Sequence, residues 1–409
     1  GTVLAVGPTG FNRAVHGDDV IVSDEQVVAV TRRNWRPFVV SFAEADSSVV
    51  IPMDRRIPKI RVVTRQASLL QKQRFVVQLD EWPLNSRYPV GHYTRTLGPI
   101  GEVSTESMAI LVEAGLEEHL SGFSSAALGC LPPQGRSWVA SLDPVKMTDE
   151  LGHPRRDLRR INPMEPALDD VGMILSVDPP GCMDIDDALS YKALPNGSHL
   201  VGVHIADVTH FIPRDSALDR EAARRATSVY LQDRRLDMLP RLLCEDLCSL
   251  CPGVDRYAVS VIWELDKTGS VVKEHIGRTV IRSVHALSYL QAQRLMDGDD
   301  PGTETTLAHT GKPVPVALWA EMREALRGLD VVAQLRLRFR RSGGAISLES
   351  GGEFKFRLDA AHRPDRVNQK QQLPIHGTIA ELMILANQCV AQATLHTHPT
   401  SALLRRHEQ

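Results

Sequence analysis

The chain has 409 residues, 43% of them hydrophobic, and a formal net charge of −3. That length is too great for one compact core and predicts two or three domains, while the near-neutral charge excludes a uniformly basic nucleic-acid binder. No apolar run is long enough to cross a membrane, and six cysteines are too few for a disulfide scaffold. We therefore expect a globular intracellular protein with free thiols and no membrane partner.

Short β-branched runs separated by turn residues fill the chain to about residue 118, among them FVVSF, SVVIPM, IRVVT and RFVVQLD. This pattern predicts small all-β modules. Such barrels commonly bind single-stranded nucleic acid by stacking bases on aromatic side chains. Four aromatic residues could act in this way, although a core or interface role is at least as common for each: Trp35, Trp82, Tyr88 and Tyr93.

The composition changes after this region. Residues 119–170 are irregular and charged, as is typical of a linker. GMILSV, LVGVHIADV and YAVSVIWELD then predict buried strands, and DREAARRATSVYL predicts a helix. Two longer helices are predicted over 316–341, which Gly343 can end, and over 377–395. The second half is therefore α+β or mixed α/β.

Basic residues occur in clusters, each typical of a solvated surface unless several clusters meet in one groove. The clusters are Arg55, Arg56, Lys59 and Arg61; Arg155, Arg156, Arg159 and Arg160; Arg224 and Arg225; Arg234 and Arg235; and Arg336, Arg338, Arg340 and Arg341.

The stretch SVDPPGCMDIDDALSY, residues 176–191, contains four aspartates. Asp178 ends a predicted buried strand, and a Pro-Pro-Gly turn follows it. The other three return on the next segment: Asp184, Asp186 and Asp187. Carboxylates gathered in this way repel and raise one another's pKa, so a cation or protons must neutralise them. Mg²⁺ prefers such oxygen ligands, and a pair of ions about 4 Å apart would support phosphodiester cleavage.

Two other interpretations of the aspartates are a Ca²⁺ loop and an acidic surface loop. An EF-hand requires Gly at position 6 and Glu at position 12. With Asp178 at position 1, those positions hold Met183 and Leu189, so the Ca²⁺ loop is excluded. A solvated loop stays open, although the apolar flanks favour a semi-buried cluster.

Two further groups of residues resemble metal ligands. Cys244, Cys248 and Cys251 have the spacing C-x3-C-x2-C, which elsewhere holds an iron–sulfur cluster. Their Leu-rich surroundings favour thiols packed in a core. His204, Asp207 and His210 could bind zinc, but packing at a strand end is the preferred interpretation.

Several motifs, spread through nearly the whole chain, match a known family pattern. They are IPMDRRIPKIR, NSRYPVGHYTRTLGPIGE, SVDPPGCMDIDDALS, VGVHIADVTHFI, SVYLQDRRLDMLP, DLCSL, VDRYAVSVIWELD, ELMILAN and ALLRRH. On these motifs the chain closely resembles the ribonuclease II (RNB) superfamily. Within it, the chain is most similar to the eukaryotic exosome-associated exoribonucleases of the Dis three and Dis three-like type.

The resemblance implies a multidomain α+β protein, in which N-terminal cold-shock/OB-type β-barrels precede a mixed α/β RNB nuclease domain. Residues 1–33 are then part of a first barrel and 34–118 form a second. Residues 119–170 are a linker, and 171–409 form an RNB catalytic domain that is truncated at its C-terminus.

The resemblance also implies an activity: 3′→5′ hydrolysis of single-stranded RNA to nucleoside 5′-monophosphates with Mg²⁺, in RNA processing and decay. The implied metal-binding and catalytic acids are Asp178, Asp184, Asp186 and Asp187, with Asp186 as the essential carboxylate. The implied RNA-binding residues are Tyr230, which stacks near the 3′-terminal base, and Tyr289 and Glu381, which recognise the ribose end. Core packing is the alternative for these three.

Two departures from the family pattern bear on activity. The chain enters the first barrel midway, and it stops at ALLRRHEQ. The family continues there with an arginine that contacts the scissile phosphate and with a last OB domain. Such an arginine can contribute on the order of 10³ in rate. The alternative function is therefore a catalytically impaired RNA-binding or exosome-assembly fragment.

The resemblance implies single-stranded RNA and the RNA exosome core as partners. It leaves open the family branch and the compartment, nucleus or cytoplasm.

Overall fold

The computed structural model describes residues 10–43, 46–141, 155–159, 170–231, 234–302, 314–345, 354–358, 364–369 and 372–402. The chain divides into two compact units. The first unit comprises Gly1–Gly122, Arg225–Met238 and Phe356–Val367, and the second comprises Phe123–Arg224, Leu239–Lys355 and Asn368–Gln409.

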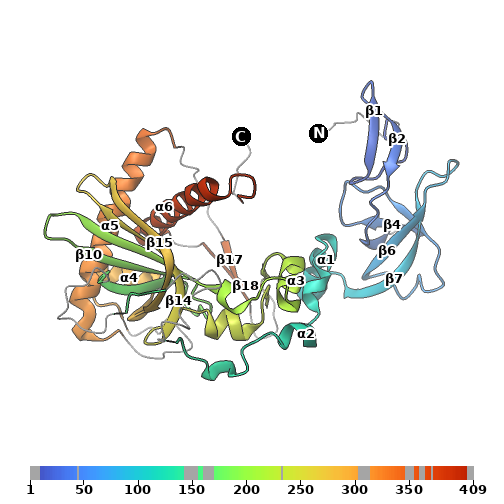
Figure 1. Ribbon diagram of the computed structural model, residues 1–409. Helices are drawn as coiled ribbons and strands as arrows, with labels where there is room; N and C mark the ends of the chain where they lie inside the picture. The colour runs from blue at the N-terminus through green and yellow to red at the C-terminus, as the bar shows by residue number, and fades with distance from the viewer. Residues whose placement is uncertain are drawn as a thin grey trace. The chain divides into compact units, whose positions relative to one another are not determined.

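A closed barrel of five strands, in the order β3-β4-β5-β7-β6, forms the core of the first unit (Figure 1). Its strands are β3 (Phe38–Ala43), β4 (Asp46–Pro52), β5 (Ile60–Val62), β6 (Gln73–Glu81) and β7 (Val90–Pro99). Phe38, Phe75 and Ile60 are fully buried inside it. Successive side chains point to opposite sides of each strand, so Val40 and Val77 enter the barrel core, whereas Val39 and Val76 belong to a second buried cluster. The expected cold-shock/OB-type barrel is confirmed.

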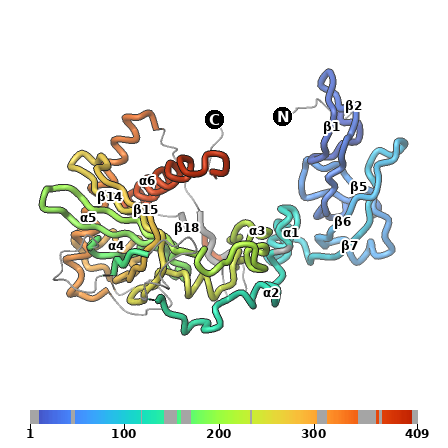
Figure 2. The backbone as a smooth tube through the Cα atoms, in the orientation of Figure 1, coloured from blue at the N-terminus to red at the C-terminus, as the bar shows by residue number. Residues whose placement is uncertain are grey.

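The remaining elements of the first unit are short. They are the hairpin β1 (Asp19–Ser23) and β2 (Gln26–Arg32), helix α1 (Val103–Glu113), the 3₁₀ turn Glu117–Leu120, and the pair β12 (Val229–Tyr230) with β13 (Arg235–Leu236). The pair β17 (Phe354–Leu358) with β18 (Pro364–Gln369) has residues in both units, because only Phe356–Val367 belong to the first. The hairpin and the barrel strands β5, β6 and β7 can be followed along the backbone in Figure 2.

Three of the four aromatic residues considered for base stacking are partly buried and pack against the barrel core. They are Trp35, Trp82 and Tyr93. The Trp82 indole N–H also donates to the carbonyl of Ser86 at 3.2 Å. Tyr88 is covered by the guanidinium of Arg87, 5.4 Å from its ring centroid.

A seven-stranded mixed sheet organises the second unit, in the order β16-β9-β10-β11-β14-β15-β8. The central strands pair antiparallel, whereas β16 and β8 at the edges pair parallel with their neighbours. The strands are β8 (Arg156–Asp157), β9 (Met173–Asp178), β10 (Asp187–Ala193), β11 (His199–Ala206), β14 (Asp255–Leu265), β15 (Val271–Arg282) and β16 (His285–Ser288). The strands predicted from GMILSV, LVGVHIADV and YAVSVIWELD are β9, β11 and β14.

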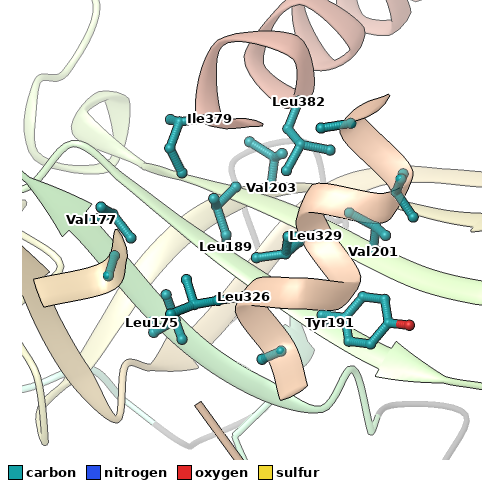
Figure 3. Packing of buried hydrophobic residues seen from close by; sticks show 14 of the residues in the cluster. Leu175, Val177, Leu189, Tyr191, Val201, Val203, Leu326, Leu329, Ile379 and Leu382 are labelled. Carbon is teal, nitrogen blue, oxygen red and sulfur yellow. The ribbon is translucent and has the colours of Figure 1, made fainter. Parts of the chain in front are cut away.

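Strands β9 and β14 are buried on both faces, so they are apolar on both sides rather than on one. One face lies under the helices α4 (Tyr289–Asp297), α5 (Trp319–Ser342) and α6 (Pro374–Thr397) (Figure 1). Figure 3 shows side chains of three strands meeting those of α5 and α6: Leu175, Val177, Leu189, Tyr191, Val201, Val203, Leu326, Leu329, Ile379 and Leu382. The opposite face packs against a second cluster that includes Leu243, Leu247 and Leu250.

Helices α5 and α6 confirm the two long predicted helices. In α5 the apolar spacing places Met322, Leu326 and Leu329 in the core, fully buried. Gly328 interrupts this pattern for a steric reason: a Cβ there would lie 2.1 Å from the ring of Tyr191. Glycine therefore lets the helix approach the sheet closely, although it costs helical stability relative to alanine.

The predicted helix DREAARRATSVYL is shorter than expected. Helix α3 spans Ala217–Arg225 and ends because Ala226 has a φ of 60°, in the left-handed region. Val229 and Tyr230 then form strand β12.

Parts of the expected 119–170 linker are packed segments. Short helix α2 (Ser125–Leu128) buries Ala127, and β8 is followed by the buried Leu158; both side chains belong to the second sheet-face cluster. Apolar side chains within an irregular stretch outweigh its loop-like composition here. Residues 142–154 and 160–169 lie outside the described part of the chain.

Among the described residues, none of the helices combines the length and apolar character that crossing a membrane requires.

Candidate active site

The aspartate loop joins two antiparallel strands of the central sheet. Asp178 is the last residue of β9, and Asp187 is the first residue of β10. Between them the Cys182 N–H donates to the carbonyl of Pro179 at 3.2 Å, and Gly181 has a φ of 79°, which favours glycine. The hairpin thus returns its acidic residues to the same end of the sheet, as the Pro-Pro-Gly turn predicted.

Buried hydrogen bonds anchor this loop. The Ile185 N–H donates to Ser249 Oγ at 3.0 Å, and that hydroxyl donates to the Met183 carbonyl at 2.9 Å. The Ala206 N–H donates to the carbonyl of Asp186 at 2.9 Å. Because the Ile185 side chain is fully buried, the backbone on both sides of it is held in place. Ser249 comes from the DLCSL motif, which sequence reasoning did not connect to the aspartates.

Asp178 is the most buried of the four aspartates. Its side chain is buried, and its Oδ2 has no hydrogen-bond partner. Burial, with smaller contributions from the charges of Asp187, Asp186 and Asp184, raises the pKa of Asp178 to about 7. Burial also raises the pKa of Asp187. A buried, unpartnered carboxylate oxygen is costly unless a proton or a cation neutralises it.

The donor chemistry of the loop fits Mg²⁺, since it offers hard carboxylate oxygens, one of them buried and without a partner. Asp186 is exposed, whereas Asp184 and Asp187 are half-buried. Within the described ranges, however, no three His, Cys, Asp or Glu side chains lie together in a group that could hold a metal ion. A bound ion would have to draw the carboxylates closer, so the assignment of Mg²⁺ stays a prediction.

Tyr289 lies beside the aspartates. Strand β16 pairs parallel with β9 so that Ser288 is opposite Asp178, and Tyr289 is the next residue. Ser288 then caps α4 by accepting a hydrogen bond from the Gln291 N–H at 3.1 Å. Burial raises the pKa of Tyr289, and the charges of Asp178 and Asp187 raise it further. The structure therefore brings this predicted RNA-binding residue to the acidic loop.

Glu381 lies on α6 and forms a two-pronged ion pair with Arg340 of α5. The Nε–Oε2 distance is 3.1 Å and the Nη2–Oε1 distance is 2.5 Å. Glu381 is 8% exposed, so this pair is largely shielded from water on its acidic side. The sequence shows Arg340 only as a member of a basic cluster, and it did not predict the ion pair with Glu381.

Tyr230, the third predicted RNA-binding residue, belongs to the first compact unit, whereas the aspartates belong to the second. It lies in the β12–β13 pair opposite Arg235, and it is 70% exposed. Its stacking role stays a prediction.

His376 was missed by sequence reasoning. Its ring stacks on that of Tyr289, with a centroid separation of 4.1 Å and an interplanar angle of 19°. Nothing in the sequence marks this contact, because the two residues come from separate helices.

The three clustered cysteines behave as packed thiols. Cys248 is buried and burial raises its pKa to about 12; Cys244 Sγ donates to the Leu239 carbonyl, and Cys251 Sγ to Ser249 Oγ. None of the six cysteines, all of which lie in the described part of the chain, forms a disulfide bond. This arrangement favours the core interpretation over a cluster-binding site.

The residues considered for zinc do not converge. His204 lies inside the sheet between the hydroxyls of Ser260 and Ser190, at 2.7 and 3.0 Å. Asp207 instead forms a buried ion pair with Arg155, with 2.6 Å between Nη2 and Oδ2.

Comparisons with known proteins agree with this architecture. The sequence pattern of the RNB domain matches residues 155–409, and that of the Dis3-like cold-shock domain 2 (CSD2) matches residues 47–115. The exosome complex exonuclease dis3 of Schizosaccharomyces pombe is 40% identical over 396 residues, which cover 93% of this chain and 37% of the relative. The exosome complex exonuclease RRP44 of Homo sapiens is 38% identical over 388 residues, which cover 93% and 36%. The chain thus spans little more than a third of these relatives.

Solved structures share the fold. Mycoplasma genitalium RNase R in complex with double-stranded RNA has a TM-score of 0.67 and 22% identity, covering 94% of this chain and 61% of that one. Yeast Ssd1, a pseudonuclease, has a TM-score of 0.62 and 18% identity, covering 93% and 44%. Because a pseudonuclease shares the architecture, the fold does not by itself establish catalysis. The family patterns nevertheless confirm the resemblance seen in the motifs: the chain belongs to the RNB exoribonuclease family, with a Dis3-like cold-shock domain ahead of its RNB domain.

Proposed function

We propose that this chain carries the nuclease core of a 3′→5′ exoribonuclease that hydrolyses single-stranded RNA to nucleoside 5′-monophosphates with Mg²⁺. The observation that supports it is Asp178, a buried carboxylate with an unpartnered oxygen and a pKa near 7, beside three further aspartates and Tyr289. The relatives are named as exosome exonucleases. RNA and the exosome core are therefore the proposed partners.

In this mechanism the four aspartates are the metal ligands, and Asp186, the exposed member, faces the substrate. Mg²⁺ bound there would activate a water and stabilise the leaving oxygen. With no cation present, about half of the Asp178 carboxyls carry a proton at neutral pH, since the pKa is about 7. Tyr289 remains a protonated phenol, because its pKa is raised, and can donate a hydrogen bond to the terminal ribose. Glu381 accepts from the ribose end while paired with Arg340.

A second function is an RNA-binding or exosome-assembly fragment with impaired catalysis. Two observations favour it. No three acidic, His or Cys side chains of the described residues form a ready metal site, and a pseudonuclease shares the fold.

Digestion of a 5′-labelled single-stranded RNA with Mg²⁺ separates the two functions. We expect the parent chain to shorten the RNA from its 3′ end and Asp186→Asn to leave it intact. Asp299→Asn, an exposed change after α4, is the matched control and should digest like the parent. RNA that is bound by all three proteins and cleaved by none would establish the second function.

A further inference from the structure

Helices α4 and α6 meet through two contacts at the start of α6. Tyr289 and Gln293 lie one turn apart on α4, so they face the same side. The ring of Tyr289 stacks on that of His376, with centroids 4.1 Å apart. Gln293 Oε1 accepts a hydrogen bond from the Ile375 N–H at 3.1 Å. The orientation of Tyr289 is therefore linked to the first turn of α6.

A separate hydrogen bond holds the His376 ring itself. The N–H of Leu373, the residue at the N-cap of α6, donates to His376 Nδ1 at 3.0 Å. Histidine thus takes the place that Glu or Gln occupies in a capping box. The His376 ring is half-buried. Because this hydrogen bond engages only the edge of the ring, the face of the ring is available to stack on Tyr289.

The tyrosine held in this way lies at the acidic site. Its neighbour Ser288 pairs with Asp178 across the sheet. A group that contacts a substrate must be placed closely, because errors on the scale of 1 Å can cost roughly 10²-fold in rate. The Tyr289 side chain rotates freely about two bonds unless packing restrains it.

We propose that His376 is a positioning residue, which stacks on Tyr289 and holds the tyrosine hydroxyl toward the ribose of the 3′-terminal nucleotide. This inference rests on the proposed function, in which Tyr289 recognises that ribose. His376 does not touch the substrate. It determines how well the site distinguishes a ribonucleotide end from a 2′-deoxynucleotide end.

The competing explanation is that His376 only caps α6. The two roles use different parts of the side chain and can be separated. His376→Gln keeps an acceptor at the third helical position, where Gln completes a capping box, but removes the ring. His376→Phe keeps a ring of similar size for stacking and removes the acceptor.

The test measures affinity for two 5′-labelled RNAs that are identical except for a 3′-terminal ribonucleotide or 2′-deoxynucleotide. Fluorescence anisotropy in EDTA prevents hydrolysis, and Tyr289→Phe serves as the reference for loss of the hydroxyl. A lost neutral hydrogen bond predicts that the parent prefers the ribose end by roughly three- to tenfold. Thermal unfolding of each variant reports on the helix cap independently.

We expect His376→Gln to reduce the preference to the level of Tyr289→Phe while keeping the parental unfolding temperature. We expect His376→Phe to keep the preference. An unchanged preference in His376→Gln, or an equal loss in both variants, would overturn the positioning role while the proposed function stands. A parent that binds both RNAs equally would overturn the ribose role of Tyr289 and this inference together.

Discussion

Asp178 lowers the stability of the folded state while it supplies a carboxylate to the proposed site. Its carboxylate is buried next to three other aspartates, and Oδ2 has no partner. In the unfolded chain it would ionise near pH 4, whereas in the folded chain its pKa is about 7. The folded state therefore holds more protons between these values, and stability falls as the pH rises from about 4 to about 7.

Replacing Asp178 with Asn removes this ionisation while keeping the shape of the side chain. In EDTA, we expect Asp178→Asn to become more stable relative to the parent as the pH rises, with the difference in their free energies of unfolding changing by roughly 2–3 kcal/mol between pH 5 and pH 8. Urea unfolding at pH 5 and pH 8 measures the difference. Asp299→Asn is the exposed control, and a pH-independent gap between parent and Asp178→Asn would contradict the argument.

At the scale of elements, a buried chain of hydrogen bonds crosses four strands of the central sheet. His204 of β11 bridges Ser190 of β10 and Ser260 of β14, and Ser260 bonds Thr279 of β15 at 2.7 Å. Complete burial lowers the pKa of His204 to about 3. The ring thus stays neutral in the fold but is protonated below about pH 6.5 in the unfolded chain, so stability is lost as the pH falls through this range.

His204→Gln cannot gain a proton, and this gives a second prediction. We expect the parent to be more stable than His204→Gln at pH 7, with the gap narrowing by about 2 kcal/mol between pH 6.5 and pH 5. The measurement is urea unfolding across that range. His396→Gln changes an exposed histidine on α6, and its free energy of unfolding should vary with pH as that of the parent does. If the difference in free energy of unfolding between the parent and His204→Gln did not change with pH, protonation of His204 would not contribute to stability.

An ion pair between Arg340 and Glu381 links helices α5 and α6, and its two side chains differ in exposure. Arg340 is partly exposed, whereas Glu381 is nearly buried and accepts two hydrogen bonds from it. Thr378 adds a hydrogen bond to Asp330 at 2.6 Å. Removing the arginine leaves a buried carboxylate without its partner, which is more costly than losing an exposed pair.

Arg340→Gln is therefore expected to lower the free energy of unfolding by roughly 1–3 kcal/mol. Arg338→Gln removes the same charge from an exposed position two residues earlier and should change it by less than about 0.5 kcal/mol. A double-mutant cycle with Glu381→Gln measures the pair itself. Equal losses in the two arginine variants would assign the effect to the basic cluster as a whole.

At the scale of the whole molecule, the predicted metal-binding acids lie in one unit, whereas Tyr230 belongs to the other. All four aspartates, Tyr289, His376 and Glu381 belong to the second unit, and the barrel belongs to the first. A cation that binds only the folded acidic loop stabilises the unit that contains it by mass action. The barrel gains nothing from that binding.

Mg²⁺ at ten times its dissociation constant is expected to stabilise the second unit by about 1.4 kcal/mol, which raises its unfolding temperature by about 3–6 °C. Scanning calorimetry with Mg²⁺ and with EDTA measures this shift. Asp186→Asn should abolish it without affecting the transition of the barrel. A shift that persists in Asp186→Asn would place the cation elsewhere.

Local features of the site could be predicted from sequence because they depend on neighbours along the chain. The strand that ends at Asp178 and the tight turn after it follow from an apolar run and from Pro-Pro-Gly. Helix α5 follows from its apolar spacing. The packing of Leu158 was missed, because a single apolar residue in a charged stretch carries no periodic signal.

The sequence by itself determined the family, the barrel-then-nuclease architecture and the hairpin that gathers the aspartates, since motifs and periodicity are properties of contiguous residues. Only the tertiary structure decided what surrounds that hairpin. Ser249 anchors the loop from 64 positions away, and Arg340 meets Glu381 across 41. Such contacts depend on how strands and helices pack, and many sequences satisfy the same periodicity with different partners. The stacking of His376 on Tyr289 is also a contact that only the tertiary structure decided.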